Sequence, residues 1–150
     1  GSMTVNAITF KNSTTESVNF TSTDDVTTYG TNAQTNFGMP SGVVAMWAGD
    51  ATADGRLNYL GTQSDLPLIR SQVFNDPDNS VFGGPPVGTF PSAGYNPTDI
   101  NMDGNTIYSG VNTDVLFIRN NIFNNPSNSV FGGPPVATYL FTQLLPEGGN

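Results

Sequence analysis

The 150-residue chain contains no cysteine and no histidine. Without cysteine it forms no disulfide and carries no reactive thiolate. Without histidine it lacks the side chain that most often acts as a general base near neutral pH, and the usual zinc ligands are missing as well. Carboxylates are the main reactive groups that remain, and we do not expect an enzyme.

Basic residues are also scarce. Lys and Arg together number 4, against 12 Asp and Glu, which gives a net charge of −8. Because nucleic-acid binding takes its affinity from Lys and Arg, a nucleic-acid partner is not expected. No apolar run approaches the roughly 20 residues that span a bilayer, so no membrane insertion is expected either. The few lysines and the many Asn and Thr favour an extracellular location, secreted or at a cell surface.

Hydrophobic residues make up 36% of the chain, which is enough for the core of one compact domain. Residues 1–3 match the remnant of a cleaved tag followed by an initiator methionine, and we leave them out of the interpretation. Residues 4–44 are rich in Thr, Asn and β-branched side chains, which predicts a β-rich N-terminal segment.

An internal repeat dominates the rest of the chain. At an offset of 49 residues, the difference between Asp99 and Asp50, the Asp, Gly and Tyr residues of 50–65 recur without a gap in 99–114. The identity continues to NSVFGGPPV, which occurs at 79–87 and again at 128–136. The repeat therefore divides the chain into copy 1 (45–91), copy 2 (94–140), and a C-terminal strand end and tail (141–150).

Each copy predicts one helix. Ser64 and Thr113 stand where an N-cap is expected, and an Asp follows each in the first turn, where a carboxylate favours the helix dipole. An Asn followed two residues later by Pro ends each helix, at Asn75 and Asn124. Apolar residues at three- and four-residue spacing predict one buried stripe per helix. They are Leu66, Ile69 and Val73 in copy 1, and Val115, Ile118 and Ile122 in copy 2.

Short strands are predicted around the helices. The Gly- and Pro-rich segment SVFGGPPV suggests a short edge strand or a tight excursion in each copy. Alternating and β-branched residues favour strands in AITF, SVNF, DVTTYG and VVAMW upstream, and in ATYLFTQLLP at 137–146. The expected fold class is α+β: two loop-helix calcium repeats in a pseudo-twofold arrangement, packed with short β-strands.

The loop before each helix offers oxygen atoms at alternating positions. A divalent cation needs several oxygens that converge at about 2.3–2.6 Å, and such a loop provides them. A glycine permits the sharp turn, the next residue offers its backbone carbonyl, and a later Asp closes the set. The candidate ligands of two Ca²⁺ ions are Asp50, Thr52, Asp54, Arg56 and Asp65 in copy 1, and Asp99, Asn101, Asp103, Asn105 and Asp114 in copy 2.

The first half of each loop follows the EF-hand pattern D-x-[DN]-x-[DN]-G, in which five residues separate the glycine from a closing acidic residue. Here nine residues separate Gly55 from Asp65, and nine separate Gly104 from Asp114. The four extra residues form an inserted turn with YLGT in copy 1 and YSGV in copy 2. If this turn bulges outward, the closing Asp stays within reach of the ion.

With these loops the chain resembles the dockerin-like tandem calcium repeats, in which a loop with Asp, Asn and Asp precedes a single helix in each of two copies. The openings AGD and TDINMDG, the Tyr-x-Gly insertion and the closing Asp are similar to repeats near the C-terminus of large secreted or surface bacterial proteins. The resemblance covers about residues 44–140. It implies a non-catalytic module that binds calcium for structural rigidity or protein–protein docking.

The chain departs from the family in its loops. Thr52 stands where Asn or Asp is usual, so we expect weaker binding in the first loop. The insertion occupies the part of the loop where dockerins that bind cohesins carry recognition residues, which argues against a cohesin partner.

Other interpretations of these residues stay open. Asp- and Asn-rich loops form turns unaided, so the two loops could serve only to cap helices. Tyr59 and Tyr108, which the inserted turns are expected to expose, could contact a protein partner or a glycan, and a carbohydrate-binding module with structural calcium is the alternative function. Arg70 and Arg119 could contact a partner or pair with a loop carboxylate.

Overall fold

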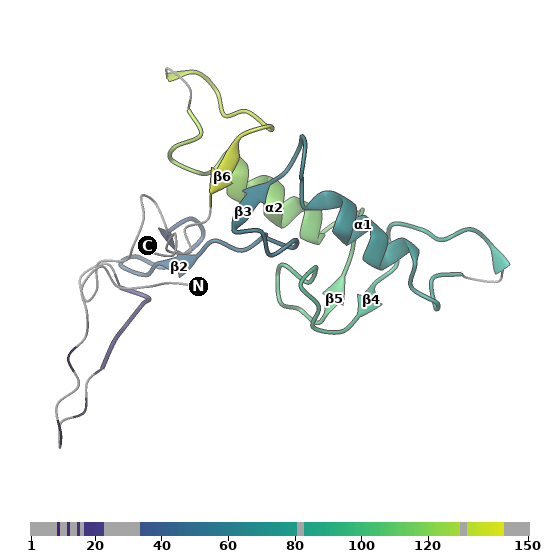
Figure 1. Ribbon diagram of the computed structural model, residues 1–150, viewed down its shortest axis with the longest axis horizontal. Coiled ribbons are helices and arrows are strands. Elements are labelled where there is room, and N and C mark those ends of the chain that lie inside the picture. The colour runs from purple at the N-terminus through teal and green to yellow at the C-terminus, as the bar shows by residue number, and fades with distance from the viewer. Residues whose placement is uncertain are drawn as a thin grey trace. The chain divides into compact units, whose positions relative to one another are not determined.

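The computed structural model describes residues 9, 12, 15, 17–22, 34–80, 83–129 and 132–142. The chain divides into two compact units, one made of Gly1–Trp47 with Gln143–Asn150 and the other of Ala48–Thr142 (Figure 1). The described residues form two helices and three two-stranded antiparallel sheets, which confirms the α+β class. Among these residues no helix is long and apolar enough to cross a membrane.

The first unit contains one small sheet. Strand β1 (Gln34–Thr35) pairs with β2 (Ala45–Met46), and β2 lies in the predicted segment VVAMW. The predicted strand SVNF is wrong, because residues 17–20 are irregular. There the side chain of Asn19 accepts hydrogen bonds from both the N–H and the hydroxyl of Thr21, which turns the chain. The predicted strand DVTTYG and most of AITF lie outside the described residues.

The second unit is built on two helices, α1 (Leu66–Phe74) and α2 (Asp114–Phe123). The predicted apolar stripes form its core, since four of their six members are fully buried. These are Ile69, Val73, Ile118 and Ile122, while Leu66 and Val115 at the helix starts are half-buried. Both helices end at the predicted asparagine, which is the C-cap residue in each.

The two helices begin differently. In α2 the predicted cap is confirmed, because the Thr113 hydroxyl accepts a hydrogen bond from the N–H of Leu116 at 3.2 Å. In α1 the N-cap is Asp65 rather than Ser64, and its side chain makes no cap hydrogen bond. Pro67 occupies the first turn and has no N–H to offer a cap, so the Asp65 carboxylate is free to face the preceding loop.

Two further sheets lie against these helices. Strand β3 (Arg56–Asn58) pairs with β6 (Leu140–Thr142), and β4 (Ser92–Ala93) pairs with β5 (Asn105–Thr106). In Figure 1, β3 and β6 lie beside α2, while β4 and β5 lie beside α1. Strand β6 falls in the predicted segment at 137–146, whereas β1 and β4 were not predicted, and β3 and β5 lie within the predicted loops.

Of the two alternatives for SVFGGPPV, the short edge strand is not present in the described parts, 83–87 and 132–136, which leaves the tight excursion. A buried asparagine holds each of these segments to the end of its helix instead. Asn79 Nδ2 donates to the carbonyls of Val73 (2.6 Å) and Val87 (3.0 Å), and its Oδ1 accepts the N–H of Val87 at 3.0 Å. Asn128 makes the same three bonds in copy 2, at 2.8, 3.0 and 3.0 Å. Side-chain amides thus replace the strand ladder.

Candidate functional site

Loop 1 (residues 50–65) folds around the carboxylate of its first residue. Asp50 accepts hydrogen bonds from the backbone N–H groups of Asp54 at 3.1 Å and Gly55 at 2.9 Å. Asp54 in turn accepts the N–H of Arg56 at 2.9 Å. Gly55 has φ 80°, a left-handed conformation that favours glycine. The first half of the loop is therefore a tight turn in which backbone donors surround a carboxylate.

Loop 2 (residues 99–114) makes the corresponding bonds. Asp99 accepts the N–H groups of Asp103 at 3.1 Å and Gly104 at 3.0 Å, and Asp103 accepts the N–H of Asn105 at 2.9 Å. The side chain of Asn101 adds two contacts with Asp103: its Oδ1 accepts the Asp103 N–H at 3.0 Å, and its Nδ2 donates to the carboxylate at 2.9 Å. Loop 2 therefore has more internal hydrogen bonds around its second acidic residue than loop 1.

The predicted closing residue of loop 1 is buried and turned back into the loop. Asp65 Oδ1 accepts the N–H groups of Ala51 (2.9 Å) and Thr52 (3.3 Å) and the hydroxyl of Thr52 (3.3 Å). Its Oδ2 accepts the N–H of Asn58 at 2.9 Å. This one carboxylate therefore joins the entry of the loop, its middle at β3 and the start of α1.

Asp114 plays the same part in loop 2. Its Oδ1 accepts the N–H groups of Ile100 at 2.7 Å and Asn101 at 3.4 Å, and its Oδ2 accepts the N–H of Ile107 at 2.7 Å. The two closing carboxylates are 1% and 0% exposed. Each carboxylate oxygen has about two lone-pair sites, so Oδ1 of both residues is fully used, while each Oδ2 accepts one N–H and has one site left.

Burial raises the pKa of both closing carboxyls above the usual value, because it disfavours the charged form. The backbone N–H donors oppose this effect by stabilising the carboxylate. At Asp65 the negative charge of Asp50 raises the pKa further. A cation bound near these groups would favour their ionised forms.

The structure brings some of the candidate ligands of loop 1 together. The Thr52 hydroxyl lies 3.4 Å from Asp50 Oδ1 and 3.3 Å from Asp65 Oδ1, so three side-chain oxygens follow one another at close range. Within the described parts of the chain, however, no three His, Cys, Asp or Glu side chains are grouped closely enough to hold a metal ion. A cation in either loop would therefore need neutral oxygens too, from Thr52, Asn101 and backbone carbonyls.

The inserted turns do not expose their tyrosines as expected. Tyr59 and Tyr108 are both half-buried. The ring of Tyr108 packs edge-to-face against Phe74, with 5.9 Å between centroids and 82° between planes. This contact occupies part of the surface that a partner or a sugar would need. By contrast Tyr95, which the loop pattern does not include, is 84% exposed and lies beside Gly104.

The helix arginines stack on aromatic rings of their own helices. The guanidinium carbon of Arg70 lies 4.6 Å from the ring centroid of Phe74, and that of Arg119 lies 4.8 Å from the centroid of Phe123. Each pair is four residues apart, so both side chains share one helix face. These cation–π contacts were not among the roles expected for the arginines.

The sequence pattern also missed Asn58, which is 5% exposed. Its Nδ2 donates to the Thr62 carbonyl at 2.9 Å, while its buried Oδ1 has no hydrogen-bond partner among the described residues. Ile107 occupies the equivalent position of loop 2. The alternation of polar positions in DGRLNYL is a signal for a buried Asn58, but the EF-hand pattern covers only the earlier positions of the loop.

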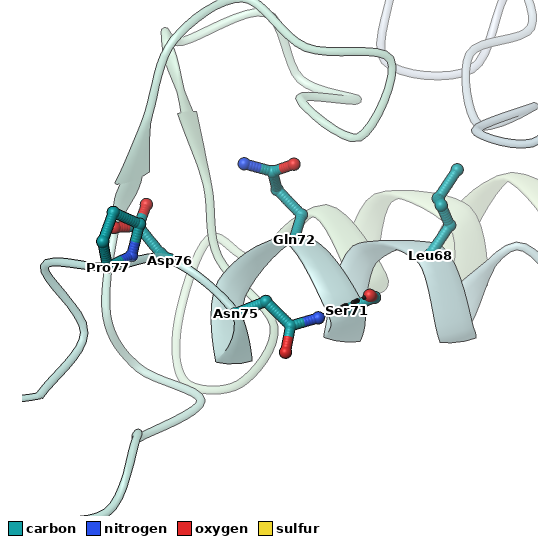
Figure 2. Close-up of a pocket in the computed structure, with 6 residues that line it drawn as sticks. All are labelled: Leu68, Ser71, Gln72, Asn75, Asp76 and Pro77. Atoms are coloured by element: carbon teal, nitrogen blue, oxygen red, sulfur yellow. Dashed lines mark hydrogen bonds between the residues drawn. The ribbon is translucent and has the colours of Figure 1, made fainter.

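A polar pocket of about 270 Å³ lies along α1, away from the candidate ligands (Figure 2). The Ser92 hydroxyl of β4 donates to the Asp76 carboxylate at 2.5 Å and accepts from Gln72 Nε2 at 3.0 Å. Figure 2 shows the hydrogen bond from Asn75 to Ser71, 2.9 Å, on the same side of the helix. The pocket is lined by Leu68, Ser71, Gln72, Asn75, Asp76 and Pro77. The hydrogen bonds of Ser92 with two of these residues, Gln72 and Asp76, therefore connect β4 to α1 and the turn after it.

Comparison of the chain with models of known protein families, with curated proteins and with solved structures finds no match.

Proposed function

We propose that residues 45–140 form a non-catalytic, extracellular calcium-binding module, dockerin-like in its two loop-helix copies, which are related by approximate twofold symmetry. One observation carries the proposal. Two loops with acidic residues at the same positions hold the first of these residues with the same two backbone hydrogen bonds. Asn and Ser close turns of this kind as well as Asp does, so the repeated choice of a carboxylate at the same positions of both loops supports a cation.

The proposed ligands of each ion are the first three oxygen side chains of the loop, one backbone carbonyl and the closing Asp. In loop 1 they are Asp50, Thr52, Asp54, the carbonyl of Arg56 and Asp65; in loop 2 they are Asp99, Asn101, Asp103, the carbonyl of Asn105 and Asp114. Six to eight oxygens surround calcium in proteins, so water would complete each set. Because Oδ2 of each closing Asp accepts a single N–H, we propose that this oxygen contacts the ion.

The proposed role of calcium is structural. The chain has no disulfide to hold its loops, and an ion that binds only the folded state adds directly to stability. Extracellular modules work with calcium affinities of roughly 10⁻⁴–10⁻³ M, which would suffice here. A rigid module of this kind would strengthen or connect part of a larger secreted or surface protein, or dock a protein partner.

Protein docking is favoured over glycan binding for one reason. A sugar-stacking platform needs exposed aromatic rings, and the Tyr108 ring is packed on Phe74. The two tyrosines of the inserted turns therefore do not offer a pair of free faces.

The test is calorimetric melting in EDTA and then in millimolar calcium. We expect a large calcium-dependent rise in melting temperature, and a smaller rise in each of Asp54→Ala and Asp103→Ala. Both side chains are exposed, so neither substitution should lower the melting temperature much in EDTA. Asp78→Ala serves as the control, because Asp78 is an exposed carboxylate outside the loops. An unchanged melting temperature, with no bound metal by elemental analysis, would contradict the proposal.

A further inference from the structure

The two sheets of the second unit join each loop to the end of the other copy. Strand β3 belongs to loop 1, and its partner β6 begins at the last residue of copy 2; β5 belongs to loop 2, and its partner β4 directly follows copy 1. The registers correspond as well. Leu57 pairs with Phe141 and Thr106 pairs with Ser92, and each member of one pair is 49 residues from its equivalent (106 − 57 and 141 − 92).

Helix α2 supports the entry of loop 1. Asn121 Nδ2 donates to the carbonyl of Ala48 at 2.6 Å, two residues before the first Asp of the loop. The next residue, Gly49, has φ 131°, and an added Cβ there would meet the side chain of Leu57 and lie 3.1 Å from Ile118 Cγ1. A helix of copy 2 therefore contacts the backbone immediately before loop 1.

Helix α1 and the connection after it support loop 2 in the same crossed sense. Phe74 of α1 packs against Tyr108 of loop 2. The carbonyl of Gly88, in the connection, accepts the N–H groups of Tyr108 at 3.1 Å and Ser109 at 2.9 Å. Ser92 adds a link, since its side chain binds α1 while its backbone pairs with loop 2.

We infer that each proposed calcium site is a composite of both copies: loop 1 is held in its binding conformation by α2 and β6, and loop 2 by α1 and β4. The calcium part of this inference rests on the proposed function, whereas the crossed support rests on the contacts alone. Within its own copy each loop is tied by its closing Asp, at the helix start. A single loop-helix copy is therefore not a complete binding unit.

If the support is crossed, a defect should loosen the loop that is farther away in chain order, that is, the loop of the other copy. Phe141 is 27 residues from Asp114 of loop 2 (141 − 114) and 84 from Leu57 of loop 1 (141 − 57), yet a defect at Phe141 should loosen loop 1. Phe74 lies nine residues after Asp65 of loop 1 (74 − 65), yet a defect at Phe74 should loosen loop 2.

The test compares Phe141→Ala with Phe74→Ala, two substitutions of the same chemistry, by amide hydrogen exchange of the full chain in EDTA. The reporters are the backbone N–H groups of Leu57 and Asn58 for loop 1, and of Thr106 and Ile107 for loop 2. Phe141→Ala should speed exchange in loop 1 at least tenfold more than in loop 2, and Phe74→Ala should do the reverse. Equal acceleration in both loops, or acceleration in the loop nearer in sequence, would overturn the inference.

Two additions keep the result interpretable. If an alanine variant unfolds, Phe141→Leu and Phe74→Leu keep an apolar side chain and decide the same comparison. Calcium titration of the same variants then tests whether the loosened loop is the one with weakened binding. If the unsubstituted protein binds no calcium, the proposed function fails, while hydrogen exchange in EDTA still confirms or overturns the crossed support.

Discussion

Loop 1 and loop 2 have corresponding backbone conformations, but they differ in the side-chain oxygens that they offer to a cation. Both place a non-glycine residue at positive φ before the second acidic residue, Ala53 at 57° and Met102 at 58°. Both wrap the first Asp with the same two N–H groups. Loop 1, however, has Thr52 where loop 2 has Asn101. The shared Asp and Gly residues therefore set the loop conformation, while the variable positions would set the affinity for a cation.

The largest effects are expected at the closing carboxylates. Asp65→Ala and Asp114→Ala each remove a buried acceptor of several backbone N–H groups, so each should lower the free energy of unfolding by about 3 to 5 kcal/mol even without calcium. Asp65 accepts four hydrogen bonds and Asp114 three, so the loss should be greater at Asp65. Urea denaturation in EDTA measures both, with Asp78→Ala as the exposed control. If the free energy of unfolding fell only in the presence of calcium, these residues would act as calcium ligands and would not stabilise the loop by their hydrogen bonds.

The buried asparagines of the two copies come next. Asn79→Ala and Asn128→Ala each remove three hydrogen bonds that hold the Gly- and Pro-rich segment, at a cost of about 2 to 4 kcal/mol. Because the bonds match in partner and length, we expect the two losses to agree within about 1 kcal/mol. The exposed Asn75→Ala and Asn124→Ala are the matched controls and should cost far less. Strongly unequal losses in urea titrations would show that the two copies differ where their contacts agree.

Exchange of the variable ligand tests the comparison directly. Thr52→Asn should strengthen calcium binding at loop 1 by about three- to tenfold, and Asn101→Thr should weaken loop 2 by a similar factor, because an amide oxygen is the stronger ligand. Isothermal titration of each variant, with the other loop inactivated by Asp54→Ala or Asp103→Ala, separates the two sites. No change in either affinity would exclude this position from the ligand set.

The smallest difference lies at the helix starts. Thr113→Ala removes a cap hydrogen bond and should lower the free energy of unfolding by about 1 kcal/mol. Ser64→Ala should cost less than about 0.5 kcal/mol, because the cap of α1 is Asp65 and Ser64 makes no cap bond. Thermal melting of the two variants side by side measures the difference. Equal losses would mean that Ser64 caps α1 in solution after all.

The local features of the second unit could be predicted from the sequence. Apolar spacing identified both helices, since Ile69, Val73, Ile118 and Ile122 lie on the faces that the pattern assigned to the core. The helix ends at Asn75 and Asn124 could also be predicted, because the Asn and Pro residues that end a helix act over only a few positions.

Features that depend on distant partners could not be predicted. Tyr108 was expected on the surface, and only the position of Phe74 in three dimensions decides that its ring is packed. Asn79 and Asn128 belong to a repeated motif, but nothing local indicates that their amides replace a strand. Ser64 is not the N-cap of α1, because Pro67 has no N–H to donate and the Asp65 carboxylate accepts N–H groups of the loop instead.

By itself the sequence determined that the chain has two copies of one unit, that each copy has an acidic loop before a helix, and that carboxylate and amide oxygens are its available chemistry. Spacing and residue type suffice for these conclusions, because turns, caps and helix faces are set by neighbours in the chain. Only the tertiary structure decided that β3 pairs with β6 and β4 with β5, so that each loop rests on the other copy. Strand pairing depends on which residues meet across the fold, and two copies with the same repeated pattern carry no local signal that distinguishes crossed from uncrossed pairing.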